Sequence, residues 1–116
     1  FIWGDDLEYS NRISESYPSY LVNESVVIHK TANNEGSNIA TDDFQRINRY
    51  KLAYRNESVL FREMGIKGKF YQYARLILHT SRIIFKAPDH KKKRLETLFS
   101  GVREGSKFYP KIKKVK

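Results

Sequence analysis

The strongest constraint on the fold is an apolar repeat at helical spacing near the end of the chain. Leu95, Leu98, Phe99 and Val102 follow one another at i, i+3, i+4 and i+7. This spacing places all four side chains on one face of an α-helix. Residues 89–105 are therefore predicted to form an amphipathic helix.

Two further helices are predicted before this one. The first spans residues 43–64, with an acidic N-cap at its start and Gly65 suited to end it, because glycine readily adopts the left-handed conformation. The second spans residues 69–86 and ends before Pro88. Asp89 is then placed to cap the last helix, and Gly105 to close it.

The N-terminal third shows a different pattern. Asp5 or Asp6 can cap a short helix that ends before Pro18. Residues 19–22 and 25–29 are rich in β-branched and aromatic residues and predict two short strands, joined by a turn. Residues 31–43 are polar and predict a loop. The predicted fold class is thus α+β and mostly helical, with a short β-hairpin followed by a helical extension.

Composition narrows the range of functions. The 116 residues contain no cysteine, which excludes a disulfide scaffold, a thiolate zinc site and a cysteine nucleophile. No apolar run approaches the roughly 20 residues of a membrane-spanning helix. Residues 1–29 hold five acidic residues and one basic residue, whereas residues 30–116 hold 21 basic and eight acidic residues. We expect the two parts to have different functions.

The acidic part contains the candidate site. Asp5 and Asp6 precede Glu8, a tryptophan stands at Trp3, and His29 ends the second predicted strand. These acids could simply cap a helix. Alternatively, a carboxylate that the helix N-terminus keeps ionised can remove a proton from a substrate hydroxyl. A histidine at a strand end can join carboxylates in binding a divalent metal.

Three segments in this order resemble family-2 inverting glycosyltransferases, most closely the galactofuranosyl- and rhamnosyltransferase-like enzymes. They are residues 1–9 (FIWGDDLEY), 26–30 (VVIHK) and 50–56 (YKLAYRN). The resemblance implies that residues 1–40 are the C-terminal part of a catalytic domain of GT-A type, a Rossmann-like α/β fold. Residues 41–116 would then form the helical extension with its basic tail.

The resemblance also implies roles for single residues. Asp6 matches the general base that deprotonates the acceptor, and Asp5 matches the neighbouring carboxylate that orients the site. Trp3 and Glu8 would contact the acceptor, although Gly4 between Trp3 and the acidic pair departs from the family pattern. His29 matches a histidine of the metal shell.

The implied reaction transfers a sugar, with inversion, from a nucleotide-diphosphate donor to a saccharide or lipid-linked acceptor of the cell surface. The family uses Mn²⁺ or Mg²⁺, and its nucleotide-binding strands and DxD metal motif do not occur in this sequence. We expect them upstream of Phe1, in keeping with an apolar start typical of a chain cut within a fold. Residues 1–116 alone are then expected to be inactive.

The basic residues suggest a surface partner. Arg75, His79, Arg82 and Lys86 recur at helical spacing, which predicts one basic face on the 69–86 helix. That face could bind an anionic membrane surface or could simply be solvated. A cytoplasmic protein, peripheral at the inner face of the cell membrane, would fit the first alternative. The candidate residues for this surface are Arg75, Arg82, Lys86, Lys91, Lys92 and Lys93.

Two interpretations without catalysis stay open. A chain with a pI near 9.8 could be a nucleic-acid-binding module, but no recognition motif is present and the acidic start would have no role, so we expect no nucleic-acid partner. The helices could instead pair with a second copy of the chain as an oligomerisation module. Sedimentation analysis separates this alternative from the others.

Overall fold

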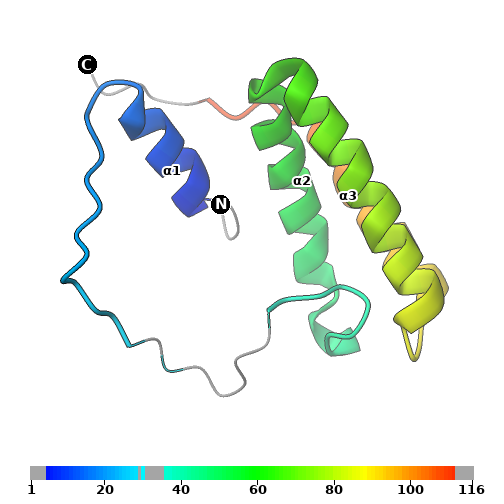
Figure 1. Cartoon of the computed structure of the whole chain (residues 1–116). Helices are drawn as coiled ribbons and strands as arrows, with labels where there is room; N and C mark the ends of the chain where they lie inside the picture. Colours follow the sequence, from blue (N-terminus) through cyan, green and yellow to red (C-terminus); the bar gives the residue numbers. More distant parts are fainter. Residues whose placement is uncertain (1–4, 29, 31–35, 112–116) are drawn as a thin grey trace.

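The computed structural model describes residues 5–28, 30 and 36–111. All regular secondary structure within these residues is helical (Figure 1). The elements are α1 (Asp5–Ser14), the 3₁₀ turn η1 (Phe44–Arg46), α2 (Asn48–Glu63), α3 (Gly65–Lys86) and α4 (Lys91–Lys107). All four predicted helices are thereby confirmed, with η1 preceding α2 where one continuous helix was expected.

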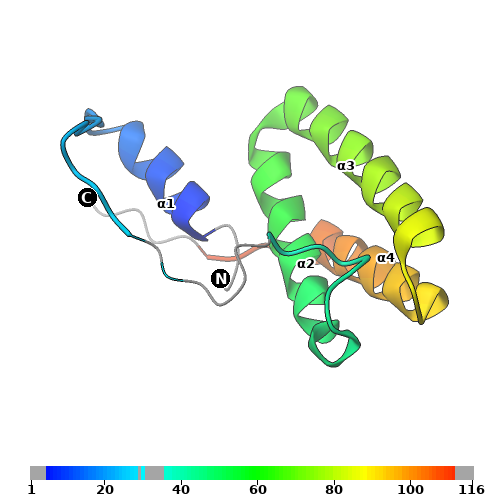
Figure 2. The same ribbon diagram turned by 60° about the horizontal axis from the view of Figure 1, so that its bottom comes forward.

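Helix α2 forms the centre of a three-helix unit and packs against both α3 and α4 (Figures 1 and 2). Its buried residues meet apolar side chains from α3 and α4 and from the segment before η1. The core consists of Ile39, Ala40, Ile47, Tyr50, Tyr54, Ile83, Ala87 and Leu98. Leu98, at the centre of the apolar repeat of α4, is completely buried.

Two glycines allow α2 and α4 to approach closely. A Cβ atom added to Gly101 would lie 2.6 Å from the carbonyl oxygen of Lys51, and one added to Gly105 would lie 2.6 Å from that of Arg55. No real side chain tolerates such distances to backbone atoms. Gly105 therefore lies inside α4 as a packing residue, and the prediction that it closes this helix is wrong.

Arg94 of α4 forms hydrogen bonds with the segment before η1. Its guanidinium is 1% exposed, and Nη1 donates to the carbonyl oxygens of Ile39 at 2.7 Å and Asp42 at 3.0 Å. The guanidinium also forms an ion pair with Asp89. Asp89 was expected to cap α4, but the N-cap is His90, which has a left-handed backbone with φ of 42° and no side-chain capping bond. The carboxylate of Asp89 instead compensates the buried charge of Arg94.

The predicted β-hairpin and the GT-A α/β end are wrong for the described residues, which contain no strand. The turn at residues 23–24 is present, and the amide of Ser25 donates to the carbonyl of Val22 at 3.2 Å. The flanking segments, however, have no regular secondary structure and expose their apolar side chains; Leu21 is 90% and Val26 84% exposed. The physical reason is that an isolated two-stranded hairpin without a covered face is marginal at best in water.

Candidate functional site

The predicted catalytic residues Asp5 and Asp6 belong to the first turn of α1. Asp6 is exposed to solvent, and the backbone of Asp5 begins the helix. The first-turn amides of a helix have no partner within it, so this end of α1 offers hydrogen-bond donors. The structure thus places Asp6 where a substrate hydroxyl can reach its carboxylate.

Glu8 lies on α1 two residues beyond Asp6 and therefore on a different face of the helix. It is half-buried and accepts a hydrogen bond from Nε of Arg12, one turn later, at 2.9 Å. This ion pair fixes one oxygen of Glu8, and the second oxygen stays available as an acceptor.

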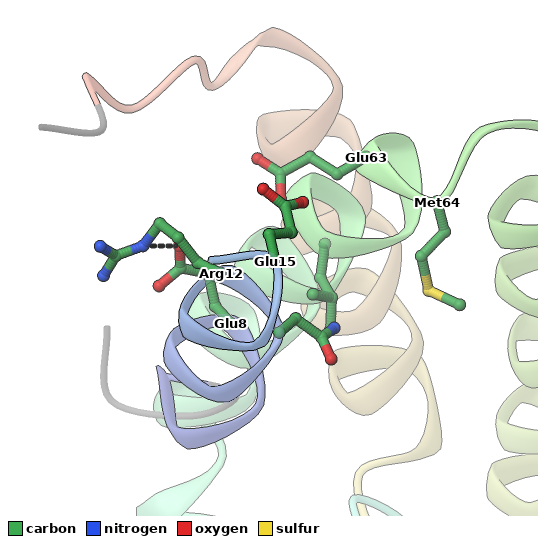
Figure 3. A pocket seen from close by; sticks show the side chains of 7 residues that line it. Glu8, Arg12, Glu15, Glu63 and Met64 are labelled. Carbon is green, nitrogen blue, oxygen red and sulfur yellow. Dashed lines mark hydrogen bonds and ion pairs between the residues drawn. The ribbon is translucent and has the colours of Figure 1, made fainter. Parts of the chain in front are cut away.

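Glu8 lines a groove of about 470 Å³ between α1 and the C-terminal end of α2 (Figure 3). The groove combines carboxylates with an apolar floor. Its lining consists of Glu8, Asn11, Arg12, Glu15, Leu60, Glu63 and Met64. With three carboxylates and one guanidinium, the groove is acidic and rich in hydrogen-bond acceptors. Asp6 does not line the groove, so the structure does not bring the two predicted site residues Asp6 and Glu8 into one pocket.

Trp3, the predicted acceptor contact, and His29, the predicted metal ligand, both lie outside the described residues. In the part of the chain that the structure describes, no three histidine or carboxylate side chains come together as a metal shell. The described residues alone therefore do not fit a complete divalent-metal site.

The residues of the predicted basic face of α3 have different surroundings in the structure. Arg75 forms an ion pair with Glu57 of α2, and His79 is half-buried against α2. Arg82 and Lys86 are exposed, as are Lys91, Lys92 and Lys93 at the start of α4. Among the described helices, none is both long and apolar enough to cross a membrane.

A polar cluster that the sequence did not predict joins α2 to α3. His79 Nδ1 lies 2.6 Å from the hydroxyl of Tyr54, and Arg75 Nη2 donates to Glu57 Oε1 at 2.6 Å. These four residues line a cavity of about 170 Å³. Tyr54 and Glu57 are three residues apart on α2, and Arg75 and His79 are four apart on α3, so the two pairs face each other across the turn at Gly65. The sequence signal for the cluster is a polar pair at helical spacing on each side of Gly65.

Burial controls the ionisation of this cluster. Burial, together with the charges of Arg75 and Arg82, lowers the pKa of His79 to about 4. Burial also raises the pKa of Tyr54, and it raises the pKa of Glu57 despite the opposing effect of Arg75. His79 is thus neutral at pH 7, and its ring can accept the hydroxyl hydrogen of Tyr54 through Nδ1 when Nε2 carries the ring hydrogen.

The free energy of unfolding is expected to fall as the pH drops from 6.5 to about 4. The folded-state pKa of His79 lies below its unfolded value, so the unfolded chain binds more protons in this window and stability is fully present only above pH 6.5. Because the ring is only half-buried and solvent screens it, the loss from this residue should be on the order of 2 kcal/mol, less than the full pKa difference implies. Chemical denaturation at several pH values measures it. His79→Gln keeps an acceptor for Tyr54 without titrating, so an unchanged pH slope in this variant would contradict the assignment.

Helix α1 therefore supplies an exposed carboxylate and one side of an acidic groove. The contacts between α2 and α3 form a separate polar cluster whose members pair with one another. Comparisons of the chain with protein-family models, with curated proteins and with solved structures gave no match.

Proposed function

We propose that the chain is the C-terminal part of a family-2 inverting glycosyltransferase, in which α1 contributes the catalytic base. The observation that carries the proposal is the exposed carboxylate of Asp6 in the first turn of α1. The ordered resemblance of residues 1–9, 26–30 and 50–56 to this family supports it. The three-helix unit of α2, α3 and α4 would be the helical extension that carries α1.

Asp6 would act on the acceptor. Its carboxylate accepts the proton of an acceptor hydroxyl while the hydroxyl oxygen attacks the anomeric carbon of the donor sugar. The new carbon–oxygen bond forms as the bond to the nucleoside diphosphate breaks, and the diphosphate leaves with the electron pair. Because attack and departure occur on opposite faces of the sugar, the anomeric configuration is inverted.

The acidic groove would bind a part of the acceptor other than the hydroxyl that Asp6 deprotonates. Carboxylate oxygens accept hydrogen bonds from sugar hydroxyls, and the groove offers those of Glu8, Glu15 and Glu63. Leu60 and Met64 add apolar surface against which the less polar face of a sugar ring can pack. The groove therefore supports the predicted acceptor role of Glu8, at a position distinct from that of Asp6.

The resemblance implies that Mn²⁺ or Mg²⁺ assists departure of the diphosphate. His29 would supply one ligand, and since the described residues form no complete shell, the others would come from the donor-binding part of the protein. The donor-binding part would also bind the nucleotide sugar. In this proposal, donor, metal and acceptor would meet at α1 only in a longer protein that includes the donor-binding part.

Release of nucleoside diphosphate tests the proposal. We expect the longer protein to release it from one member of a panel of nucleotide sugars when a saccharide acceptor is present, and a chelator to abolish the release. Added Mn²⁺ or Mg²⁺ should restore it. Absence of release with every donor and acceptor of the panel would contradict the proposed transferase.

A further inference from the structure

Helix α3 carries a row of large apolar side chains that face solvent rather than the core. Ile66, Phe70, Tyr73 and Ile77 are 87%, 73%, 68% and 69% exposed, and Ile84 extends the row by two turns. Their spacing of 4, 3, 4 and 7 residues places them on one face of the helix. We call these five residues the outer face of α3. The opposite face, with Gly68 and the buried Ile83, packs against the rest of the unit.

The outer face is unusual for a surface helix. Scattered exposed apolar residues are ordinary, but a continuous row along one helix indicates a surface that binds something. Tyr71, Leu78 and Phe85 widen the row on one side, and each is at least 46% exposed. In Figures 1 and 2, α3 lies at one edge of the three-helix unit, so this face is directed away from α2.

The charges around the outer face identify the kind of partner. Helix α3 contains five basic residues and no acidic residue. Lys67 and Lys69 flank the beginning of the row, and both are exposed. Arg82 and Lys86 are exposed as well, but each is two residues from Ile84 and therefore lies on another face of the helix. Lys91 and Lys92 continue the positive charge into the start of α4. Long basic side chains beside an apolar row can place their charges at lipid headgroups while the row enters the acyl boundary.

Other partners fit these observations less well. A second copy that packed its own outer face here would add another helix with basic residues and no acidic residue, so that no carboxylate of α3 could pair with Lys67 and Lys69. A nucleic acid would match the charges but would leave the apolar row unpaired. We therefore propose that α3 docks the protein, by its outer face, on the surface of an anionic lipid bilayer. This proposal stands independently of the proposed transferase activity.

Vesicle co-sedimentation tests the docking surface. The full chain is expected to pellet with phosphatidylglycerol-containing vesicles and to bind phosphatidylcholine vesicles at least about tenfold more weakly. The double variant Phe70→Ser, Ile77→Ser should lose about tenfold or more in affinity, because both side chains leave the bilayer interface. Its matched control is Val26→Ser, Ile28→Ser, which removes apolar residues of 84% and 79% exposure from the segment before η1 and should bind like the wild type.

A second pair of variants tests the charges. Lys67→Gln, Lys69→Gln is expected to weaken binding to anionic vesicles about tenfold, whereas Arg46→Gln, Arg103→Gln removes two exposed charges away from α3 and should have a small effect. Circular dichroism confirms that each variant is folded. Equal affinity of the outer-face and control variants, or equal affinity for both kinds of vesicle, would overturn the proposal. So would a dimer that depends on Phe70 and Ile77, seen by sedimentation in a protein that does not pellet with vesicles.

Discussion

Replacing Asp6 by asparagine is expected to reduce kcat of sugar transfer by about 10²–10⁴-fold, the usual contribution of a general base. The amide has the shape of the carboxylate but cannot take the proton of the attacking hydroxyl. Asp6 is exposed in the first turn of α1, so the substitution should leave the helix and the three-helix unit intact. Steady-state kinetics on the longer protein, with donor and acceptor varied separately, measure the effect.

Two control substitutions make this prediction specific. Glu24→Gln removes an exposed carboxylate from the segment after α1 and should leave kcat and KM unchanged. Glu8→Gln alters the groove and is expected to raise KM for the acceptor more than it lowers kcat, because it removes binding without removing the base. If Asp6→Asn retains full activity, Asp6 is a helix-terminal residue only and the catalytic assignment fails.

Replacing Gly105 by valine is expected to lower the free energy of unfolding by about 3 kcal/mol, at the upper end of the usual cost of overpacking. The new Cβ would lie 2.5 Å from Cβ of Ser58 and 2.6 Å from the carbonyl oxygen of Arg55. Relief requires α4 to move away from α2, which opens the core around Leu98. The gain in helix propensity over glycine, roughly 0.5 kcal/mol, is too small to compensate. Urea denaturation followed by circular dichroism gives the value.

Gly36→Val is the matched control for this substitution. A Cβ at Gly36 meets nothing within 4 Å, so the same exchange there should change the free energy of unfolding by a few tenths of a kcal/mol. Similar losses in both variants would show that the close approach of α2 and α4 does not limit the side chain at position 105.

The helices could be predicted from sequence because their signals are local. The apolar repeat of α4 places Leu98 in the core, and Asp43 caps η1 by accepting the amide of Gln45 at 3.0 Å, as its position before the helix predicts. Gly65 ends α2 with φ of 65°, a conformation that favours glycine. Spacing, caps and turns within one segment settle each of these features.

The strands could not be predicted reliably because a strand depends on a partner outside its own segment. Val26 and Val27 have the side chains of a strand, yet among the described residues no neighbouring backbone pairs with them. The partners of the basic residues of α3 could not be predicted for a related reason. Helical spacing shows that Arg75 and His79 share a face with Lys86, but only the register of α2 against α3 shows that Glu57 and Tyr54 occupy that face.

The candidate site could be predicted in part. Sequence placed Asp6 at the start of a helix, and the structure has it there. The sequence did not predict the groove at Glu8, because the groove depends on how α1 lies beside the C-terminal end of α2. Leu60 and Met64, which line the groove at that end, are more than 50 residues from Glu8 along the chain. Contacts between segments so far apart are set by packing rather than by local pattern.

The most direct measurement is a proton NMR time course of the longer protein with its nucleotide-sugar donor and a saccharide acceptor. It follows the anomeric proton of the transferred sugar and thus reports transfer and stereochemistry together. We predict a new glycoside of inverted anomeric configuration, formed together with nucleoside diphosphate. A product of retained configuration, or donor signals that stay unchanged with every acceptor, would contradict a single displacement with Asp6 as the base.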